Sequence, residues 1–217
     1  MSRRALIQYL ELLKQSGVRQ LFQAPVNIEA VPDKRQMLDS LKAAYADCNK
    51  CPLAAGRINL VYGEGNPAAR AMLIGEGPGE QENLSGRPFV GAAGQLLEKM
   101  LAAINIKRED IYIANIVKCR PEGNRNPSQE ERLACLPYLV EQIQIIQPRL
   151  LLVMGLVAAQ TLFGDTNTLT WHRENHGDFM GIPAWVTYHP AALLRNSNWK
   201  RPAWEDLQAF QKEYENL

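Results

Sequence analysis

The sequence predicts an α/β fold, a three-layer domain in which helices flank a central, mostly parallel sheet of about four strands. The first observation is that short apolar runs alternate with longer amphipathic segments from residue 71 onward, as parallel strands and crossover helices do. The second is size, because 217 residues with 46% hydrophobic content can bury the core of one such domain.

The N-terminal part stands apart from this pattern. Residues 3–15 predict an amphipathic helix that ends at Ser16-Gly17, and a loose stretch containing Pro25 and Pro32 follows it. We therefore expect two parts, an N-terminal helical appendage and linker (residues 1–35) and the main domain (residues 36–217). A helix at 34–47 leads directly into the first cysteine.

The remaining elements alternate along the chain. Strands are predicted at residues 71–75, 111–117, 150–154 and 184–188, and helices at residues 91–104, 129–146, 156–163 and 203–215. Ser128 and Glu131 form a capping box that starts the second of these helices, and Pro202 favours the start of the last. The polar stretch between residues 165 and 182 predicts a hairpin.

Charge and apolar content limit the functional class. Lys and Arg total 24 and Asp and Glu total 23, a net charge of +1, so any surface that attracts nucleic acid must be local. The sequence shows no signal peptide and no apolar run long enough to cross a membrane, so a cytoplasmic protein is expected. In that reducing compartment the four cysteines indicate metal ligands or catalytic groups rather than disulfides.

Three polar loops follow predicted strands, at residues 75–89, 115–127 and 188–196. Ligands of such folds bind beyond the carboxyl ends of the strands, so these loops predict one shared site. The glycines at 75, 77 and 79 are not a dinucleotide fingerprint, because Glu80 stands where the third glycine is needed. Taken singly, Phe89 is typical of a core residue, and His172 and His176 are typical of structural histidines.

The cysteine spacing favours an iron–sulfur cluster over zinc. Cys48 and Cys51 are separated by two residues, whereas Cys119 and Cys135 are too far apart to form the second knuckle of a zinc ribbon. Clusters held only by thiolates tolerate such dispersed ligands. Four ordinary buried cysteines are the alternative.

Five motifs together resemble the family 4 uracil-DNA glycosylases, the iron–sulfur type of this superfamily: "CNKCPLAAGR", "GEGPGEQE", "GRPFVGAAGQLL", "ANIVKCRPEGNRNP" and "YHPAALLR". They cover roughly residues 40 to 215, in the order in which the family has them. The resemblance implies a DNA-repair enzyme that flips uracil out of single- or double-stranded DNA and hydrolyses its N-glycosidic bond. No lyase activity is expected. The resemblance also implies a [4Fe–4S] cluster held by Cys48, Cys51, Cys119 and Cys135.

The resemblance further assigns the active site. Phe89 becomes the platform on which the flipped base stacks, and Asn115 reads the base. Gly77 belongs to the uracil site, and His189 faces the leaving uracil. Glu76 and Glu82 are the catalytic carboxylates, and we favour Glu76 for the attacking water and Glu82 for the C5 edge of the base.

DNA would be held by local basic and apolar residues on two of the loops. The expected contacts are Lys118, Arg120, Arg125, Leu193, Leu194, Arg195, Lys200 and Arg201. One of the two leucines is the expected wedge that fills the gap left by the flipped base, and the N-terminal helix is a candidate docking element for a repair or replication protein. Two other classes remain open at this point, an electron-transfer or redox-sensing iron–sulfur protein and a zinc-stabilised nucleic-acid-binding module.

Overall fold

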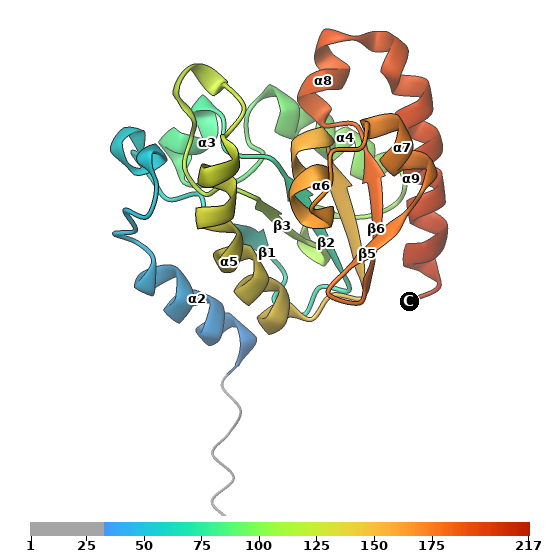
Figure 1. Ribbon diagram of the computed structural model, residues 1–217. Coiled ribbons are helices and arrows are strands. Elements are labelled where there is room, and N and C mark those ends of the chain that lie inside the picture. Colours follow the sequence, from blue (N-terminus) through green and yellow to red (C-terminus); the bar gives the residue numbers. More distant parts are fainter. Residues whose placement is uncertain (1–32) are drawn as a thin grey trace, which may run out of the picture. The chain divides into compact units, whose positions relative to one another are not determined.

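A six-stranded sheet in the order β1-β3-β2-β4-β6-β5 runs through the domain (Figure 1). In this computed structural model, residues 33–217 are described. The four inner strands are parallel: β2 (Ala71–Gly75), β3 (Tyr112–Asn115), β4 (Leu150–Met154) and β6 (Ile182–Thr187). They are the four predicted strands, so the α/β class is confirmed. The edges are two short antiparallel strands: β1 (Glu64–Gly65), which was not predicted, and β5 (Gly177–Phe179), which lies within the predicted hairpin.

Helices cover both faces of the sheet, because strand side chains alternate between two cores. Met72 and Ile74 of β2 point into one core, and Leu73 points into the other. The first core includes residues of α2 (Lys34–Ala44), α5 (Gln129–Ile146) and α6 (Leu156–Phe163); the second includes α4 (Ala92–Ala103) and α9 (Lys200–Glu215). In Figure 1, α5 and α6 lie in front of the sheet and α4 lies behind it.

The longer helices begin close to where the sequence places them. Helix α5 spans the predicted residues, and Ser128 and Glu131 form the expected capping box. Three six-residue helices were missed: α3 (Glu80–Ser85), α7 (Leu169–Glu174) and α8 (Pro190–Arg195). Short 3₁₀ turns occur at Pro52–Gly56, Arg108–Asp110, Glu122–Asn124 and Ser197–Trp199.

The predicted hairpin at residues 165–182 is only partly correct. Its first half is helix α7 (Leu169–Glu174), where the Thr168 hydroxyl accepts a hydrogen bond from the backbone of Trp171. The hairpin itself is made by β5 and β6. The predicted helix at residues 3–15 lies outside the described residues.

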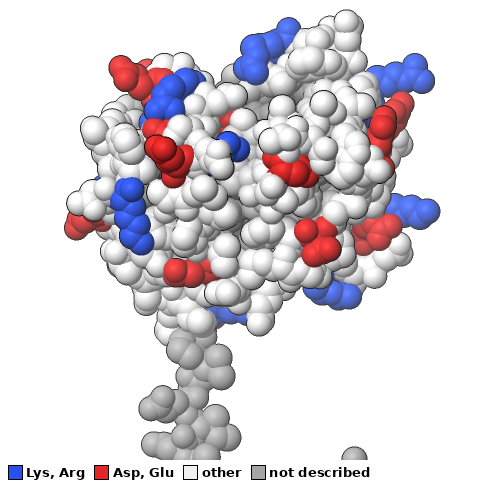
Figure 2. All heavy atoms as spheres, in the orientation of Figure 1, with Lys and Arg blue, Asp and Glu red and all other residues white. Residues whose placement is uncertain are grey.

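The described residues contain no membrane-spanning helix, and the face of the molecule in Figure 2 carries charges of both signs. None of its helices is long and apolar enough to cross a bilayer. Figure 2 shows basic and acidic side chains interspersed over one face of the molecule, which agrees with the net charge of +1. Any charged binding surface on this face is therefore local.

Candidate active site and thiol cluster

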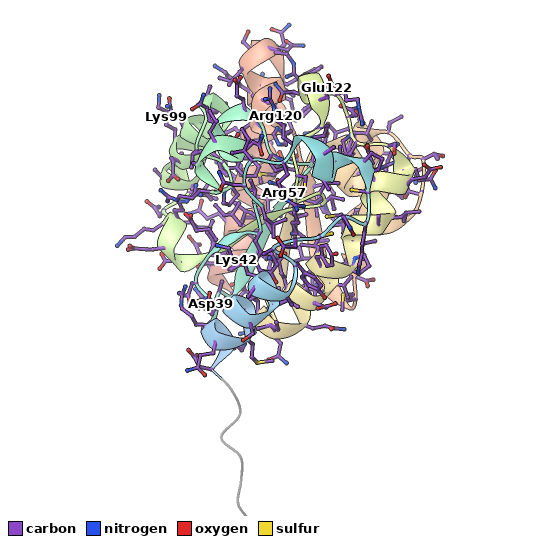
Figure 3. All side chains as sticks on the ribbon, turned by 90° about the vertical axis from the view of Figure 1, so that its left-hand side faces the viewer. Asp39, Lys42, Arg57, Lys99, Arg120 and Glu122 are labelled. Atoms are coloured by element: carbon purple, nitrogen blue, oxygen red, sulfur yellow. The ribbon has the colours of Figure 1, made fainter. Side chains whose placement is uncertain are left out.

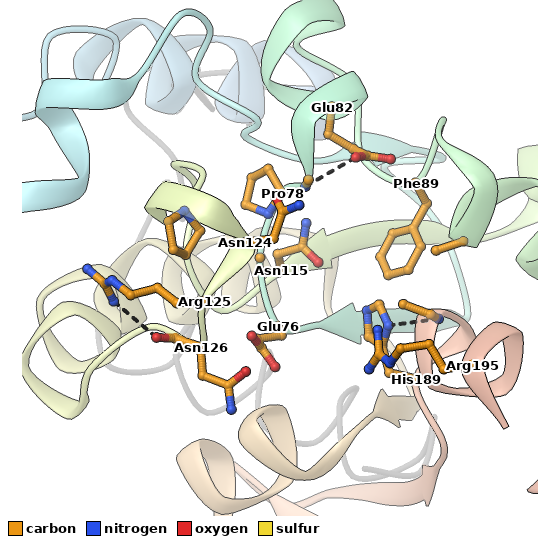
Figure 4. Close-up of a pocket in the computed structure, with 15 residues that line it drawn as sticks. Glu76, Pro78, Glu82, Phe89, Asn115, Asn124, Arg125, Asn126, His189 and Arg195 are labelled. Carbon is orange, nitrogen blue, oxygen red and sulfur yellow. Dashed lines mark hydrogen bonds between the residues drawn. The ribbon is translucent and has the colours of Figure 1, made fainter.

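One pocket lies at the carboxyl ends of β2, β3 and β6, where the three polar loops meet (Figure 4). Its cavity measures about 290 Å³, close to the lower end of the range for small-molecule sites. All six predicted catalytic and uracil-binding residues line it: Glu76, Gly77, Glu82, Phe89, Asn115 and His189. The convergence expected from the sequence is therefore present in the structure.

Phe89 belongs both to the core and to the pocket. The residue packs with the apolar residues of α4, and its ring centroid lies 5.5 Å from that of His189. Its backbone φ is 52°, a left-handed conformation that costs a bulky residue about 1–3 kcal/mol. The core interpretation and the platform interpretation of this phenylalanine are thus compatible.

Asn115 ends β3 with its side chain in the pocket. Only 1% of the residue is exposed, and its Oδ1 has no hydrogen-bond partner within residues 33–217. A buried amide oxygen without a partner costs about 1–3 kcal/mol, so a ligand that donates a hydrogen bond here recovers that cost. Gly75 makes room for this arrangement, because a Cβ at that position would lie 2.5 Å from Asn115 Oδ1 and 2.6 Å from Phe89 Cζ.

The side chain of His189 presents one nitrogen to the protein and the other to the pocket. Its Nδ1 accepts a hydrogen bond from the backbone N–H of Ala191 (3.2 Å), which starts α8. The proton of the neutral imidazole is therefore on Nε2, which is buried and has no partner among the described groups. Burial, assisted by the charge of Arg195, lowers the pKa of His189 to about 4, so the ring is neutral at pH 7.

The two glutamates have different environments. The carboxylate of Glu82 is buried and accepts backbone hydrogen bonds from Gly79 (3.1 Å), Val90 (2.8 Å) and Gly91 (2.8 Å). The carboxylate of Glu76 makes no hydrogen bond or ion pair with any described residue, and Figure 4 shows it pointing into the pocket. Burial raises the pKa of Glu76, against the opposing charges of Arg132 and Arg195.

Gly77 lines the pocket because it has no side chain. A Cβ there would lie 2.7 Å from Val117 Cγ2. The backbone of the first loop can therefore approach the loop that follows β3, and any larger residue would push the two loops apart.

Two of the expected DNA contacts are wrong. Lys118 is 0% exposed, and its amine donates hydrogen bonds to the Asn115 carbonyl (2.8 Å) and to Gln142 Oε1 (2.6 Å). Burial lowers the pKa of Lys118 to about 8. Leu193 is 3% exposed and packs in the core, whereas the next residue of α8, Leu194, is 51% exposed. Two successive leucines of α8 therefore face the core and the solvent, and a helix of six residues is too short for the sequence pattern to tell which is which.

The remaining basic residues differ in their hydrogen bonds and ion pairs with neighbouring protein groups. Arg125 forms a two-pronged ion pair with Glu131 (2.7 and 2.8 Å), so most of its charge is locally balanced. Arg120, labelled in the upper part of Figure 3, donates a hydrogen bond to Asn124 Oδ1 (2.8 Å). Arg195 lines the pocket and, like Lys200 and Arg201, is exposed.

The four cysteines are free thiols that line one small cavity between the 3₁₀ turn η1 (Pro52–Gly56), the loop after β3, and α5. Lys118 N donates to Cys135 Sγ (3.3 Å), and Arg57, near the centre of Figure 3, donates to Cys119 Sγ (3.6 Å). Burial raises the pKa of Cys135 to about 11 and also raises that of Cys119. Within the described residues, no group of three His, Cys, Asp or Glu side chains is placed to hold a single metal ion.

Sequence reasoning missed part of the pocket wall. Asn124 and Asn126, from the loop after β3, line the cavity, as do Ala93 and Ala191. Asn124 adopts φ 55° after Gly123 at φ 62°, so the loop turns back over the pocket. The Gly-Asn pair in "PEGNRNP" is the signal that could have predicted this turn.

Comparison with known proteins gives a consistent set of matches. The model of the "Uracil DNA glycosylase superfamily" matches residues 62–208, which contain all three pocket loops. The chain is 41% identical over 184 residues to a Type-4 uracil-DNA glycosylase of Pyrobaculum aerophilum, a match covering 80% of this chain and 92% of that protein. It is 41% identical over 182 residues to the Type-4 enzyme of Thermotoga maritima (81% and 93%). A Type-5 uracil-DNA glycosylase of P. aerophilum is 30% identical over 151 residues (61% and 66%).

Proposed function

Because this chain belongs to the uracil-DNA glycosylase superfamily, and within it to the type-4 enzymes, we propose that its pocket receives uracil flipped out of DNA. The enzyme hydrolyses the N-glycosidic bond and leaves an abasic site, a DNA-repair reaction. The observation that carries this proposal is the set of three side chains converging from three strand ends: the ring of Phe89, the unpaired amide oxygen of Asn115 and the unpaired Nε2 of His189. An electron-transfer protein or a zinc module has no need of them.

Each of these groups matches one part of the base. Phe89 offers the flat apolar face that replaces the lost base stack, a contact worth about 1–3 kcal/mol. Asn115 Oδ1 accepts from N3–H of uracil, and its NH₂ donates to O4. His189 Nε2–H donates to O2, where negative charge gathers as the bond from C1′ to N1 breaks.

Glu76 acts on the sugar side. It accepts a proton from the attacking water while the water oxygen bonds to C1′, and the electron pair of the broken bond leaves with uracil. Two observations support this role: the carboxylate is free of hydrogen bonds to the described protein, and burial raises its pKa, which favours proton uptake. Glu82 is better explained as the residue that ties its own loop to the Phe89 loop through three backbone N–H groups. This revises the C5-edge role expected from the sequence.

Hydrolysis alone is expected, without cleavage of the DNA strand. Lyase chemistry uses an amine that attacks C1′, and no lysine is found among the described residues that line the pocket. Lys118 is the nearest in sequence to the base reader, yet both of its amine contacts are with protein groups.

DNA binding is proposed for the exposed residues that surround the pocket. Leu194 is the wedge, since its neighbour is buried, and Arg195, Lys200 and Arg201 contact phosphates. Arg120 contributes from the other loop, and Arg125 contributes only if its ion pair with Glu131 opens. The appendage of residues 1–35, with a repair or replication protein as its partner, remains a proposal.

The function is tested by one experiment. The purified protein is incubated with a uracil-containing oligonucleotide and with a matched thymine-containing one, and each product is divided into samples with and without alkali. Strand cleavage at the uracil position only after alkali supports a monofunctional glycosylase. Cleavage without alkali contradicts the monofunctional assignment, and no cleavage in either sample contradicts the function.

We propose further that Cys48, Cys51, Cys119 and Cys135 hold a [4Fe–4S] cluster. Four thiols around one cavity supply the all-sulfur ligand set that such clusters use, and N–H groups of Lys118 and Arg57 point at two of the sulfurs. When bound, the cluster supplies a cross-link between three segments of the chain. Because burial raises the pKa of Cys119 and Cys135, these thiols must release their protons when the cluster binds.

If the cluster is present, the protein should be brown, and replacing Cys119 by serine should remove this colour and lower the melting temperature together. Each kcal/mol of lost stability lowers Tm of a domain of this size by about 2–4 °C, so the linked loss is measurable by absorbance, iron analysis and thermal unfolding. Ala134→Ser, which adds a hydroxyl to the same cavity wall, is the matched control and should keep both colour and Tm. A colourless Cys119→Ser protein that melts like the parent would show that the cluster is not structural.

Replacing Phe89 by alanine should weaken binding of the flipped base by about 1–3 kcal/mol. The measurement is the single-turnover excision rate as a function of enzyme concentration, which separates binding from chemistry. Phe89→Leu keeps the apolar volume that the core needs and removes only the flat face, so it should fold like the parent yet share most of the loss. Parent-like excision by the leucine variant would return Phe89 to a purely structural role.

A further inference from the structure

The short stretch that carries the stacking ring, Pro88 to Gly91, is held from two sides. From one side Glu82 Oε1 accepts the N–H groups of Val90 and Gly91, both at 2.8 Å. From the other side Arg108 donates to the carbonyls of Pro88 (2.6 Å) and Phe89 (3.2 Å). A carboxylate therefore holds the donors and a guanidinium holds the acceptors of one stretch of backbone.

We infer that Arg108 is a positioning residue that holds the Phe89 ring in the base-stacking orientation by fixing the left-handed backbone beneath it. The inference rests on the proposed function and extends it to a residue that lies outside the pocket, in the turn that precedes β3. Its sequence position, 19 residues from Phe89, gives no hint of this contact.

The geometry explains why an arginine is needed. Its two terminal nitrogens form a planar fork that reaches two successive carbonyls, which the single ammonium of lysine cannot match. Arg108 is itself fixed, because Nε contacts Glu64 (3.2 Å) and Nη1 contacts Glu98 (2.8 Å). Helix α4 adds to the support, since Gly94 packs so closely under the Phe89 carbonyl that a Cβ there would overlap it.

A left-handed conformation of a bulky residue persists only where its surroundings determine it. Without the guanidinium, Phe89 is free to relax to negative φ, which turns the ring away from the pocket. Small displacements of a positioning group cost up to about 10²-fold in rate.

The test combines two measurements on Arg108→Gln. Hydrogen exchange of the amides of residues 89–91 should become faster, and single-turnover excision of uracil should fall by about 10- to 10²-fold. In a Phe89→Ala background the same change should have less than about a twofold effect, because the group that it positions is gone. Arg108→Lys should give exchange and excision rates between those of the parent and of Arg108→Gln, because lysine keeps the positive charge but lacks the two-nitrogen fork.

Arg87→Gln is the matched control. Arg87 also makes a two-pronged contact with Glu64 (2.6 and 2.9 Å), yet it donates to no carbonyl of residues 88–91. It should leave exchange and excision near those of the parent. If Arg108→Gln leaves loop exchange unchanged, or slows excision equally in the parent and in the Phe89→Ala background, the inference is wrong. Should the glutamine variant fail to fold, Arg108→Lys carries both measurements. Hydrogen exchange tests the positioning even if the parent excises no uracil, which separates failure of this inference from failure of the proposed function.

Discussion

Replacing Asn115 by aspartate should reduce uracil excision by a factor on the order of 10² or more, if each mismatched polar contact costs about 1–3 kcal/mol. The aspartate keeps an acceptor for N3–H but loses the donor to O4, so that oxygen faces a carboxylate. The residue is 1% exposed, so water screens neither the negative charge of the aspartate nor the lone pairs of uracil O4. Because cytosine offers an N4 donor, the same variant should excise cytosine faster than the parent.

The measurement is single-turnover excision from matched uracil and cytosine oligonucleotides. Asn126→Asp is the control, because Asn126 also lines the pocket but is exposed. It adds the same negative charge near the DNA without touching the base-reading amide, so it should retain most of the parent rate. Near-parent excision by Asn115→Asp would remove Asn115 from the role of base reader.

Replacing His189 by alanine should slow excision by about 10²–10³-fold, the typical loss when one preorganised donor to a developing anion is removed. The His189 ring is already oriented by the Ala191 N–H on Nδ1, so Nε2–H needs no reorganisation as charge builds on uracil O2. His176→Ala removes an imidazole that packs on Trp185 outside the pocket. A comparable loss in the control would mean that the effect comes from the fold and not from the donor.

The lowered pKa of His189 also fixes a pH dependence. With a pKa of about 4, against an ordinary value of 6.5, the imidazole does not titrate between pH 5.5 and pH 8, so it should add no step to the excision rate in that range. The unfolded chain binds this proton more readily than the folded one. The stability contributed by the neutral buried ring is therefore complete above pH 6.5 and is lost as the pH falls toward 4. Urea unfolding of the parent and His189→Ala across this window would measure it.

The sequence predicts the scaffold well because short apolar runs alternating with longer amphipathic segments fit only strands alternating with helices. Strands β2 and β4 and helices α5 and α6 occupy the predicted residues, and the pocket residues lie together because parallel strands end at one edge. The catalytic and base-binding roles proposed for these residues come from the family resemblance, because the fold alone does not indicate them.

What the sequence could not show depends on contacts between distant residues. Lys118 looks like a surface lysine beside a cysteine, but Gln142, 24 residues away on α5, provides the partner that makes its burial possible. The three N–H partners of Glu82 are backbone groups, which carry no sequence signal. Helices of six residues, such as α3 and α8, are too short for periodicity to reveal them.

The close approach of Phe89 and Asn115 over Gly75 has an evolutionary consequence. The stacking ring and the base-reading amide both lie against the bare backbone of Gly75, so a side chain added at this position of β2 would displace both of them. A lineage that adapts to another damaged base must therefore keep Gly75 and change other residues that line the pocket. The segment with most freedom to do so is the exposed loop at residues 122–126. Diversity among descendants of this enzyme should accumulate there first.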